Sequence, residues 1–161
     1  ISSLLDVEGE LVVNCTGLGA RELCDDEEVV PVRGQIIYIE QDPGFGRFDQ
    51  RPENLIYTIP RRDVTVLGGT AQKGDWHGEV RESDTKEILE KCSVLWPELD
   101  RSKIVGKAVG LRPSRNEVRL EADRSDDRMV IHNYGHGGAG VTLSWGCADE
   151  VMALVSRLNQ P

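Results

Sequence analysis

The sequence predicts a mixed α/β fold of the α+β class, built on an antiparallel-rich sheet. Short runs rich in β-branched residues recur along the chain and end at Gly, Pro or Asp clusters, as strands do. Only two longer segments carry the apolar spacing of a helix. With 161 residues, of which 39% are apolar, the chain is long enough for one ordinary domain or for pieces of two.

The first strand candidate is ELVVN at residues 10–14, a β-branched run that ends in the turn-forming CTGLGA. Its composition suggests a buried strand. Further strand-like runs lie at residues 35–39, 54–59, 64–67, 104–111, 118–120 and 129–132. Clustered Pro, Gly and Asp at residues 42–53 predict an exposed loop between two of these strands.

The two helix candidates lie in the middle and at the end of the chain. Ser83 is a plausible N-cap for the first, Pro97 ends it, and its apolar face is formed by Ile88, Leu89, Cys92 and Leu95. The second spans residues 142–158 and is amphipathic, with Val151, Leu154 and Val155 on its apolar face.

The charge and composition exclude several classes of protein. A formal net charge of −9 argues against nucleic acid as a partner, since that binding uses clustered Lys and Arg. No apolar run approaches the roughly 20 residues that cross a bilayer, and the first residues lack a secretory signal, so a soluble intracellular protein is expected. The scattered cysteines form no C-x-x-C pair and predict buried reduced thiols rather than disulfides or a zinc site; they are Cys15, Cys24, Cys92 and Cys147.

Residues 131–145 read IHNYGHGGAGVTLSW, so a strand passes through closely spaced glycines into a helix. Glycine allows a ligand to approach the backbone, and the first turn of a helix has N–H groups without helical partners. Such an end attracts anions and electron-rich ring oxygens. A tight turn without any ligand is the alternative that the sequence leaves open. The glycines disfavour a helix around His132 and His136, so we expect hydrogen-bond partners there and no metal pair.

A second glycine segment, Gly17-Leu18-Gly19, follows the first strand candidate and imitates the start of a dinucleotide fingerprint, with Glu40 roughly 20 residues further on. The third glycine of that fingerprint is replaced by Glu22. The following DDEEVVPVRG is too acidic and too interrupted by proline for the helix that would hold a pyrophosphate. A fragment of an NAD-dependent dehydrogenase therefore stays only as an alternative.

Two polar residues stand in apolar strand segments. Arg112 ends the run VGLRP, and a partly buried guanidinium there must find an anion or a set of acceptors. Its fork geometry fits a carboxylate bidentately, although a salt bridge to an acidic side chain would also satisfy it. Tyr57, inside LIYTIP, is ordinarily a core aromatic with its hydroxyl satisfied. Neither residue by itself indicates a function.

Six segments in order along the chain resemble the C-terminal half of the FAD-dependent D-amino-acid oxidase and D-aspartate oxidase family. They are VVNCTGLGA (12–20), PVRGQ (31–35), IYTIPR (56–61), VTVLGGTAQKGDW (64–76), GLRPSR (110–115) and HNYGHGGAGVTLSWGCA (132–148). The resemblance implies a substrate-binding domain at 25–122. It also implies parts of a Rossmann-like FAD-binding domain at 1–24 and 123–161.

The resemblance assigns roles to single residues. It implies that Arg112 pairs with the substrate carboxylate, that Tyr57 donates its hydroxyl to the same group, and that the Gly138 carbonyl faces the substrate amine. The flavin would be contacted by Gly137, Gly138, Ala139, Gly140, Val141 and Thr142, with the strand of Val12 and Val13 near the cofactor. Amides at the helix start would stabilise negative charge on the reduced flavin. No side chain is assigned as an acid or base, because the cofactor carries the chemistry.

The implied reaction oxidises a D-amino acid with dioxygen to an imino acid, which hydrolyses, and to hydrogen peroxide. The family's N-terminal G-x-G-x-x-G fingerprint is absent, so the sequence is expected to be a fragment or to need a separate N-terminal half, and a homodimer is left open. A peroxisomal location is expected in a eukaryote and a cytoplasmic one in a bacterium, although the NQP terminus carries no S-K-L-type signal.

Some positions differ from the family pattern. Members selective for acidic substrates carry an arginine where this chain has Ala71, which favours neutral D-amino acids, and Arg61 or Arg62 are candidates to replace that charge. Glu53 stands where some members carry a tyrosine, so the lid of the site is expected to differ. A D-aspartate oxidase and a noncatalytic relic of the family remain the alternatives.

Overall fold

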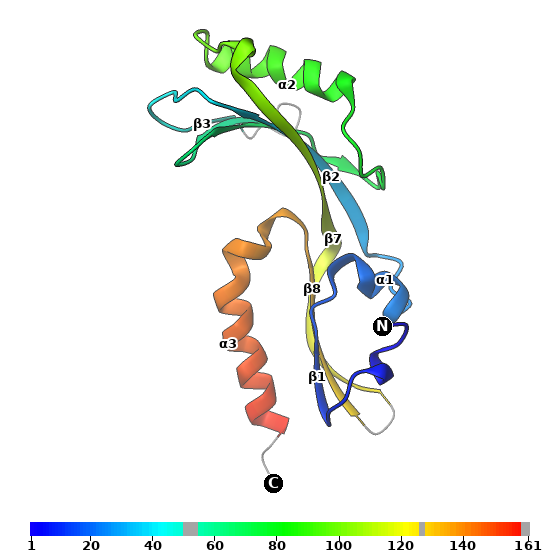
Figure 1. Ribbon diagram of the computed structural model, residues 1–161. Helices are drawn as coiled ribbons and strands as arrows, with labels where there is room; N and C mark the ends of the chain where they lie inside the picture. Colours follow the sequence, from blue (N-terminus) through cyan, green and yellow to red (C-terminus); the bar gives the residue numbers. More distant parts are fainter. Residues whose placement is uncertain (50–54, 126–127, 159–161) are drawn as a thin grey trace. The chain divides into compact units, whose positions relative to one another are not determined.

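The computed structural model describes residues 1–49, 55–125 and 128–158. The chain divides into two compact units, whose strands and helices are labelled in Figure 1. One unit, Ile1–Val32 with Arg112–Pro161, is discontinuous in sequence, and the other, Arg33–Leu111, is continuous. We call them the discontinuous unit and the continuous unit.

The sheet of the discontinuous unit places β8 (Arg128–His136) between β1 (Leu11–Asn14) and the later part of β7 (Ile104–Ser125). β1 runs parallel to β8 and pairs Leu11 with Met129. β7 runs antiparallel to β8, and its register shifts partway along the pair. The parallel pairing joins two segments from opposite ends of the sequence.

Helix α3 (Gly140–Leu158) packs on β8, and the short α1 (Ala20–Leu23) lies on the other side of that strand (Figure 1). A small apolar core lies beneath α1, formed by Ala20, Val29 and Tyr134 with Leu18 and Cys24 packed against it. Three 3₁₀ turns complete the unit: η1 (Leu4–Asp6), η2 (Gly17–Gly19) and η4 (Gly137–Ala139). Within the described ranges, no helix is long and apolar enough to cross a membrane.

The continuous unit is a sheet in the order β7-β2-β5-β4-β3, with β6 also paired to β2. Besides β7, the strands of this sheet are β2 (Val30–Ile39), β3 (Arg47–Asp49), β4 (Ile56–Pro60), β5 (Thr65–Gly68) and β6 (Gln72–Lys73). The β2/β5, β4/β5 and β3/β4 pairs are all antiparallel. This arrangement agrees with the predicted antiparallel-rich sheet.

Helix α2 (Glu82–Leu95) covers β4 and β5, and η3 (Arg101–Lys103) follows it. The core between the helix and the sheet contains Ile37, Ile39, Ile56, Leu67, Ile88, Leu89, Cys92 and Trp96. Alternation of apolar residues on the strands and their helical spacing on α2 bring these side chains to one layer. Burial raises the pKa of the Cys92 thiol to about 12.

The predicted strands are present, but several differ in extent, since β2 already begins at Val30 and β8 continues to His136. Residues 104–111 and 118–120 belong to one long strand, β7, because its later part continues as the partner of β8. The 42–53 segment is not entirely loop, since β3 pairs with β4 there. Residues 50–54 of the loop and strand predictions, Glu53 among them, lie outside the described residues.

Two local predictions were wrong. Helix α2 begins one residue before Ser83, and its N-cap is Arg81, whose side chain makes no capping hydrogen bond. Its start is instead held by Gln35 on β2, whose Nε2 donates to the Arg81 carbonyl at 2.9 Å and whose Oε1 accepts from the Arg81 amide at 2.8 Å. Not every thiol is buried: all four cysteines are free, but Cys15 is exposed.

Candidate functional site

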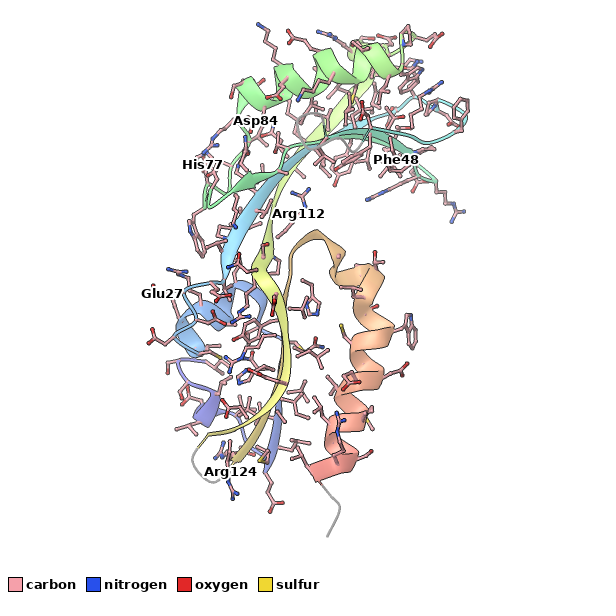
Figure 2. The ribbon with its side chains drawn as sticks, turned by 180° about the vertical axis from the view of Figure 1, so that it is seen from behind. Glu27, Phe48, His77, Asp84, Arg112 and Arg124 are labelled. Carbon is pink, nitrogen blue, oxygen red and sulfur yellow. The ribbon has the colours of Figure 1, made fainter. Side chains whose placement is uncertain are left out.

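The glycine turn between β8 and α3 lies against the segment of β7 that starts at Arg112 (Figure 2). A Cβ atom added to Gly138 would lie 3.4 Å from Arg112 Cδ, and one added to Gly137 would lie 3.5 Å from Ser114 Oγ. At Gly135 it would lie only 2.7 Å from the Cβ of Arg115. Of these three positions, only Gly135 has no room for a Cβ, because the Arg115 side chain occupies that space.

Backbone geometry adds a second requirement for glycine at two of these positions. Gly135 has φ +91° and Gly137 has φ +56°, in the left-handed region that side chains disfavour. Gly138 and Gly140 have no such φ, and a Cβ on either would come no closer than 3.4 Å to a neighbouring atom. The sequence left two interpretations of this turn open, a backbone cradle for a ligand and a tight turn. The observed geometry is compatible with both.

A hollow of about 250 Å³ opens beside the turn. It is lined by residues that follow β1, the Pro113 region of β7, the end of β8 and the start of α3: Cys15, Gly17, Pro113, Asn133, Tyr134, Gly135, His136, Gly140, Ser144 and Cys147. Gly17 has φ +58°, and a Cβ built on it would lie 3.5 Å from Pro113 Cγ, so the CTGLGA turn lies next to the GLRP segment. The CTGLGA and GLRP motifs, which are far apart in the sequence, thus line the same hollow.

The start of α3 has the character of an anion-attracting helix end. The first turn of this described helix carries no acidic side chain that would neutralise the positive end of its dipole. Val141, in that turn, is 91% exposed. Of the two strand residues expected near a cofactor, Val12 is buried and Val13 is 43% exposed.

A hydrogen-bond network fixes the turn after β1. Asn14 Oδ1 accepts from the amide of Thr16 at 3.1 Å and from its hydroxyl at 2.7 Å. The Asn14 amide nitrogen therefore faces His132, 3.2 Å from Nδ1, which makes Nδ1 the acceptor. Burial, and then the charge of Arg119, lowers the pKa of His132. His136 has a local partner too, with its Nε2 3.4 Å from Cys147 Sγ.

A second network lies under the β7 segment and was not expected from the sequence. The Tyr134 hydroxyl donates to Asp26 Oδ2 at 2.9 Å and accepts from Arg119 at 2.8 Å, while Arg115 Nε donates to the same Asp26 oxygen at 3.0 Å. Burial opposes ionisation of Asp26, but Tyr134 and Arg115 outweigh it and lower the pKa of that carboxyl. Burial raises the pKa of Tyr134 to about 12.

This network connects the site to distant parts of the sequence. Asp26 follows α1, whereas Arg115 lies three residues after Arg112 on β7. The one available signal was the GLRPSR motif, which contains Arg115 but gives no indication of its partner. Pairing across 89 positions of sequence depends on the tertiary fold.

Tyr57 belongs to the continuous unit, whereas Arg112 and the glycine turn belong to the discontinuous one. Tyr57 lies on β4 directly opposite Gly68 of β5 and is half-buried. Its ring stacks at a tilt of 33° near Phe48, with 6.4 Å between the ring centroids. It is therefore not the fully buried core aromatic that the apolar run suggested.

The positions relevant to charge selectivity lie in two separate hollows of the continuous unit. Ala71 lines one of about 210 Å³, together with Gly69, Gln72 and Lys91, and the Lys91 ammonium is paired with Glu87 at 2.5 Å. Arg61 and Arg62 line the other, of about 250 Å³, where they are surrounded by Glu40, Asp42 and Asp63.

The imitation of a dinucleotide fingerprint at Gly17-Leu18-Gly19 does not lead into a crossover helix. Helix α1, which follows it, spans only Ala20–Leu23. Its neighbouring loop instead supplies Asp26 to the Tyr134 network. A helix this short does not provide the dipole and length that pyrophosphate binding uses in such folds.

The glycine turn, Arg112 and a helix start without an acidic side chain in its first turn lie close together in the discontinuous unit, an arrangement that suits an anionic or electron-rich ligand. Comparison with known proteins agrees, because the family model for FAD dependent oxidoreductases matches residues 4–154. The chain belongs to the FAD-dependent oxidoreductase family. The expected resemblance is confirmed.

Among its relatives, the D-amino-acid oxidase of Rubrobacter xylanophilus is 47% identical over 160 residues, covering 96% of this chain and 49% of the relative. The D-aspartate oxidase of Homo sapiens is 41% identical over 152 residues, covering 92% of this chain and 44% of that relative. The chain spans about half the length of the curated relatives it matches.

The fold is also found in solved structures of oxidases. Glycine oxidase from Bacillus cereus matches with a TM-score of 0.81 at 21% sequence identity, covering 96% of this chain and 44% of that chain. At this identity the likeness concerns the fold alone. It agrees with the predicted mixed α/β class.

Proposed function

We propose that this chain is the C-terminal portion of a flavin-dependent D-amino-acid oxidase, which converts D-amino acids to imino acids and then 2-oxo acids with formation of hydrogen peroxide. The observation that carries the proposal is that Arg112 lies beside the glycine turn at Gly138, next to the start of α3. A carboxylate-binding group and a cofactor-binding backbone then share one location.

The residues at the turn fit an isoalloxazine ring. Bare backbone at Gly137 and Gly138, an unneutralised helix start and an adjoining hollow of about 250 Å³ suit an electron-rich ring edge. In this proposal the ring and ribityl chain are held by Gly137, Gly138, Ala139, Gly140, Val141 and Thr142, with Val12 and Val13 on the neighbouring strand. FAD, when bound, supplies the oxidising chemistry by accepting the substrate Cα hydride and passing two electrons to dioxygen.

The chain's own residues bind and orient the substrate. Arg112 pairs bidentately with the substrate carboxylate, Tyr57 donates its hydroxyl to it, and the Gly138 carbonyl accepts from the amine. Fixing these two groups leaves one direction for the Cα–H bond, which selects the D enantiomer. No protein side chain needs to act as general acid or base.

The proposal favours neutral side chains over acidic ones. Ala71 provides no cation, and the neighbouring Lys91 is already paired with Glu87. Arg61 and Arg62 are surrounded by carboxylates that would repel an acidic side chain. D-aspartate oxidation remains the second candidate, because the human D-aspartate oxidase is 41% identical to this chain.

We further propose that an N-terminal half with the glycine fingerprint completes the enzyme and that α3 packs against it. Val141, Trp145 and Met152 are 91%, 84% and 61% exposed along one side of α3. Their spacing of four and seven residues places them on one helical face. Large apolar residues in such a row are typical of a surface that another part of a protein covers. The predicted domain boundaries at 24/25 and 122/123 remain part of this proposal.

The experiment that tests the function replaces Arg112 with leucine in the complete enzyme. The Michaelis constant for D-alanine should rise about 100-fold or more, because charge-assisted bidentate hydrogen bonds to the carboxylate are lost. Flavin absorbance should remain, since the guanidinium is not needed to hold the ring. Arg124→Leu, at the other end of the described part of β7 (Figure 2), is the matched control. An unchanged Michaelis constant in Arg112→Leu would remove this residue from the site.

A further inference from the structure

Tyr57 and Gly68 face each other across the β4/β5 pair. A Cβ atom built on Gly68 would overlap with Cζ, Cε2 and Oη of the tyrosine, far inside van der Waals contact. The phenol ring therefore lies directly across the bare backbone of Gly68. A glycine inside a strand is weakly stabilising by itself and often marks a close approach of another group.

The hydroxyl end of the ring continues over the next residue. A Cβ on Gly69 would lie 2.9 Å from Tyr57 Oη and 3.3 Å from the carbonyl oxygen of Gln35. The polar end of the tyrosine is thus seated on two consecutive glycines. The position of the Tyr57 hydroxyl is set by the missing side chains at Gly68 and Gly69 as well as by the rotamer of Tyr57.

The backbone beneath the ring is held by several contacts and has little freedom to move away. Cys92 Sγ, from the buried side of α2, lies 3.7 Å from the Tyr57 carbonyl oxygen and 3.9 Å from that of Gly68. The Gln35 amide donates to Thr70 Oγ1 at 2.8 Å, one residue past the glycine pair. A side chain at Gly68 would therefore displace the ring rather than the strand.

We propose that Gly68 is a positioning residue for substrate binding, with Gly69 extending its surface. Together they fix the position of the Tyr57 ring and its hydroxyl on the sheet before the substrate arrives. This inference rests on the proposed function, in which Tyr57 binds that carboxylate. Because the Tyr57 ring is already oriented, less conformational entropy is lost when the substrate binds.

The test is a double-mutant cycle in the complete enzyme, with the Michaelis constant and turnover number for D-alanine as readouts. Tyr57→Phe should raise the Michaelis constant about tenfold through loss of one hydrogen bond to a charged group. Gly68→Ala should raise it by a similar factor with little change in turnover, because uniform binding is lost. In the Tyr57→Phe background, Gly68→Ala should add no further increase. Gly78→Ala, where a Cβ meets no atom within 4 Å, is the matched control.

The outcomes separate the two proposals. If Tyr57→Phe raises the Michaelis constant and Gly68→Ala does not, the positioning inference is overturned while the role of Tyr57 stands. If Tyr57→Phe has no effect, the carboxylate role of Tyr57 is lost and the positioning inference with it.

Should Gly68→Ala fail to fold, thermal melting of the Tyr57→Ala/Gly68→Ala double variant decides the matter. Removing the ring removes the overlap, so the double variant should melt at the temperature of Tyr57→Ala alone. A double variant that melts lower or does not fold would show that Gly68 is required for another reason, which overturns the inference.

Discussion

At the scale of single residues, the surroundings of His132 favour its neutral form. It is 4% exposed, and the orientation of Asn14 makes His132 Nδ1 an acceptor. Burial lowers its pKa below the ordinary value, with the Arg119 charge acting in the same direction. Protonation would therefore cost more in the folded state than in the unfolded one.

The sign of the resulting pH dependence follows from proton binding. As pH falls below about 6.5, the unfolded chain takes up the His132 proton before the folded chain does, so stability decreases. The loss levels off below the folded-state pKa. Urea unfolding of the complete enzyme between pH 5 and 8 should show this decrease, and His132→Gln should reduce its slope. A slope equal to that of the parent enzyme would contradict the prediction, and His77→Gln is the control.

Arg33 illustrates how a charge can be buried in this chain. Its guanidinium is fully buried and donates to Asp84 at 2.5 Å, to Gln72 at 2.7 Å and to Gln35 at 3.1 Å. It also donates to the carbonyl oxygens of His77 at 2.8 Å and Glu79 at 2.6 Å. These bonds join β2 to the segment that leads into α2.

Arg33→Met should destabilise the complete enzyme by about 3–5 kcal/mol, because it leaves Asp84 as a buried carboxylate without its ionic partner. The free energy of unfolding in urea measures the effect. The exposed Arg62→Met is the control, with an expected change within about 0.5 kcal/mol. A loss below about 1 kcal/mol for Arg33→Met would mean that water or another cation replaces the guanidinium.

At the scale of elements, the glycine turn and the β7 segment depend on each other. Gly135 leaves space for the Arg115 side chain, and Gly137 and Gly138 lie beside Ser114 and Arg112 of β7. The Arg115 side chain lies beside Gly135 and donates a hydrogen bond to Asp26, which links β7 to the loop after α1. The turn is consequently part of the packing of the discontinuous unit and a candidate cofactor cradle at the same time.

Two features of Gly135 therefore predict that Gly135→Ala lowers the free energy of unfolding. The residue has φ +91°, and the new Cβ would lie 2.7 Å from the Cβ of Arg115. We expect a loss of about 1–3 kcal/mol from backbone strain alone. Gly146→Ala, in α3 with open space around its Cβ, should instead stabilise by about 0.5–1 kcal/mol. Urea unfolding of both variants measures this contrast, and equal effects would contradict it.

Element boundaries show where sequence reasoning succeeds and where it fails. The β-branched runs that became β1, β4 and β5 were recognised because alternation and turn residues are local signals. The start of α2 was misplaced because Arg81 is held by Gln35, a residue far away in sequence. The Arg115–Asp26 pair was missed for the same reason.

At the scale of the whole molecule, the exposed side of α3 has a consequence for assembly. Val141, Trp145 and Met152 present apolar surface that a soluble protein does not usually leave uncovered. Under our proposal the N-terminal half covers this face.

Joining the two halves should shift Trp145 fluorescence to shorter wavelength, because its indole leaves water. Trp76 is also exposed, at 52%, so the measurement uses a Trp76→Phe background, in which Trp96 remains buried. Trp145→Ala should weaken assembly by about 2–4 kcal/mol, as truncation of a central apolar contact does. An emission maximum that stays the same on assembly would show that α3 does not face the N-terminal half.

The sequence by itself determined the mixed α/β class, the family and the residues that the family's motifs single out, because strand alternation, helical spacing and short motifs are properties of neighbouring residues. Only the tertiary structure decided that Arg112 contacts Gly138, that Arg115 binds Asp26 and that Tyr57 rests on Gly68. Each of these contacts joins residues separated by many positions, and the relative placement of such residues depends on chain packing that local patterns do not encode.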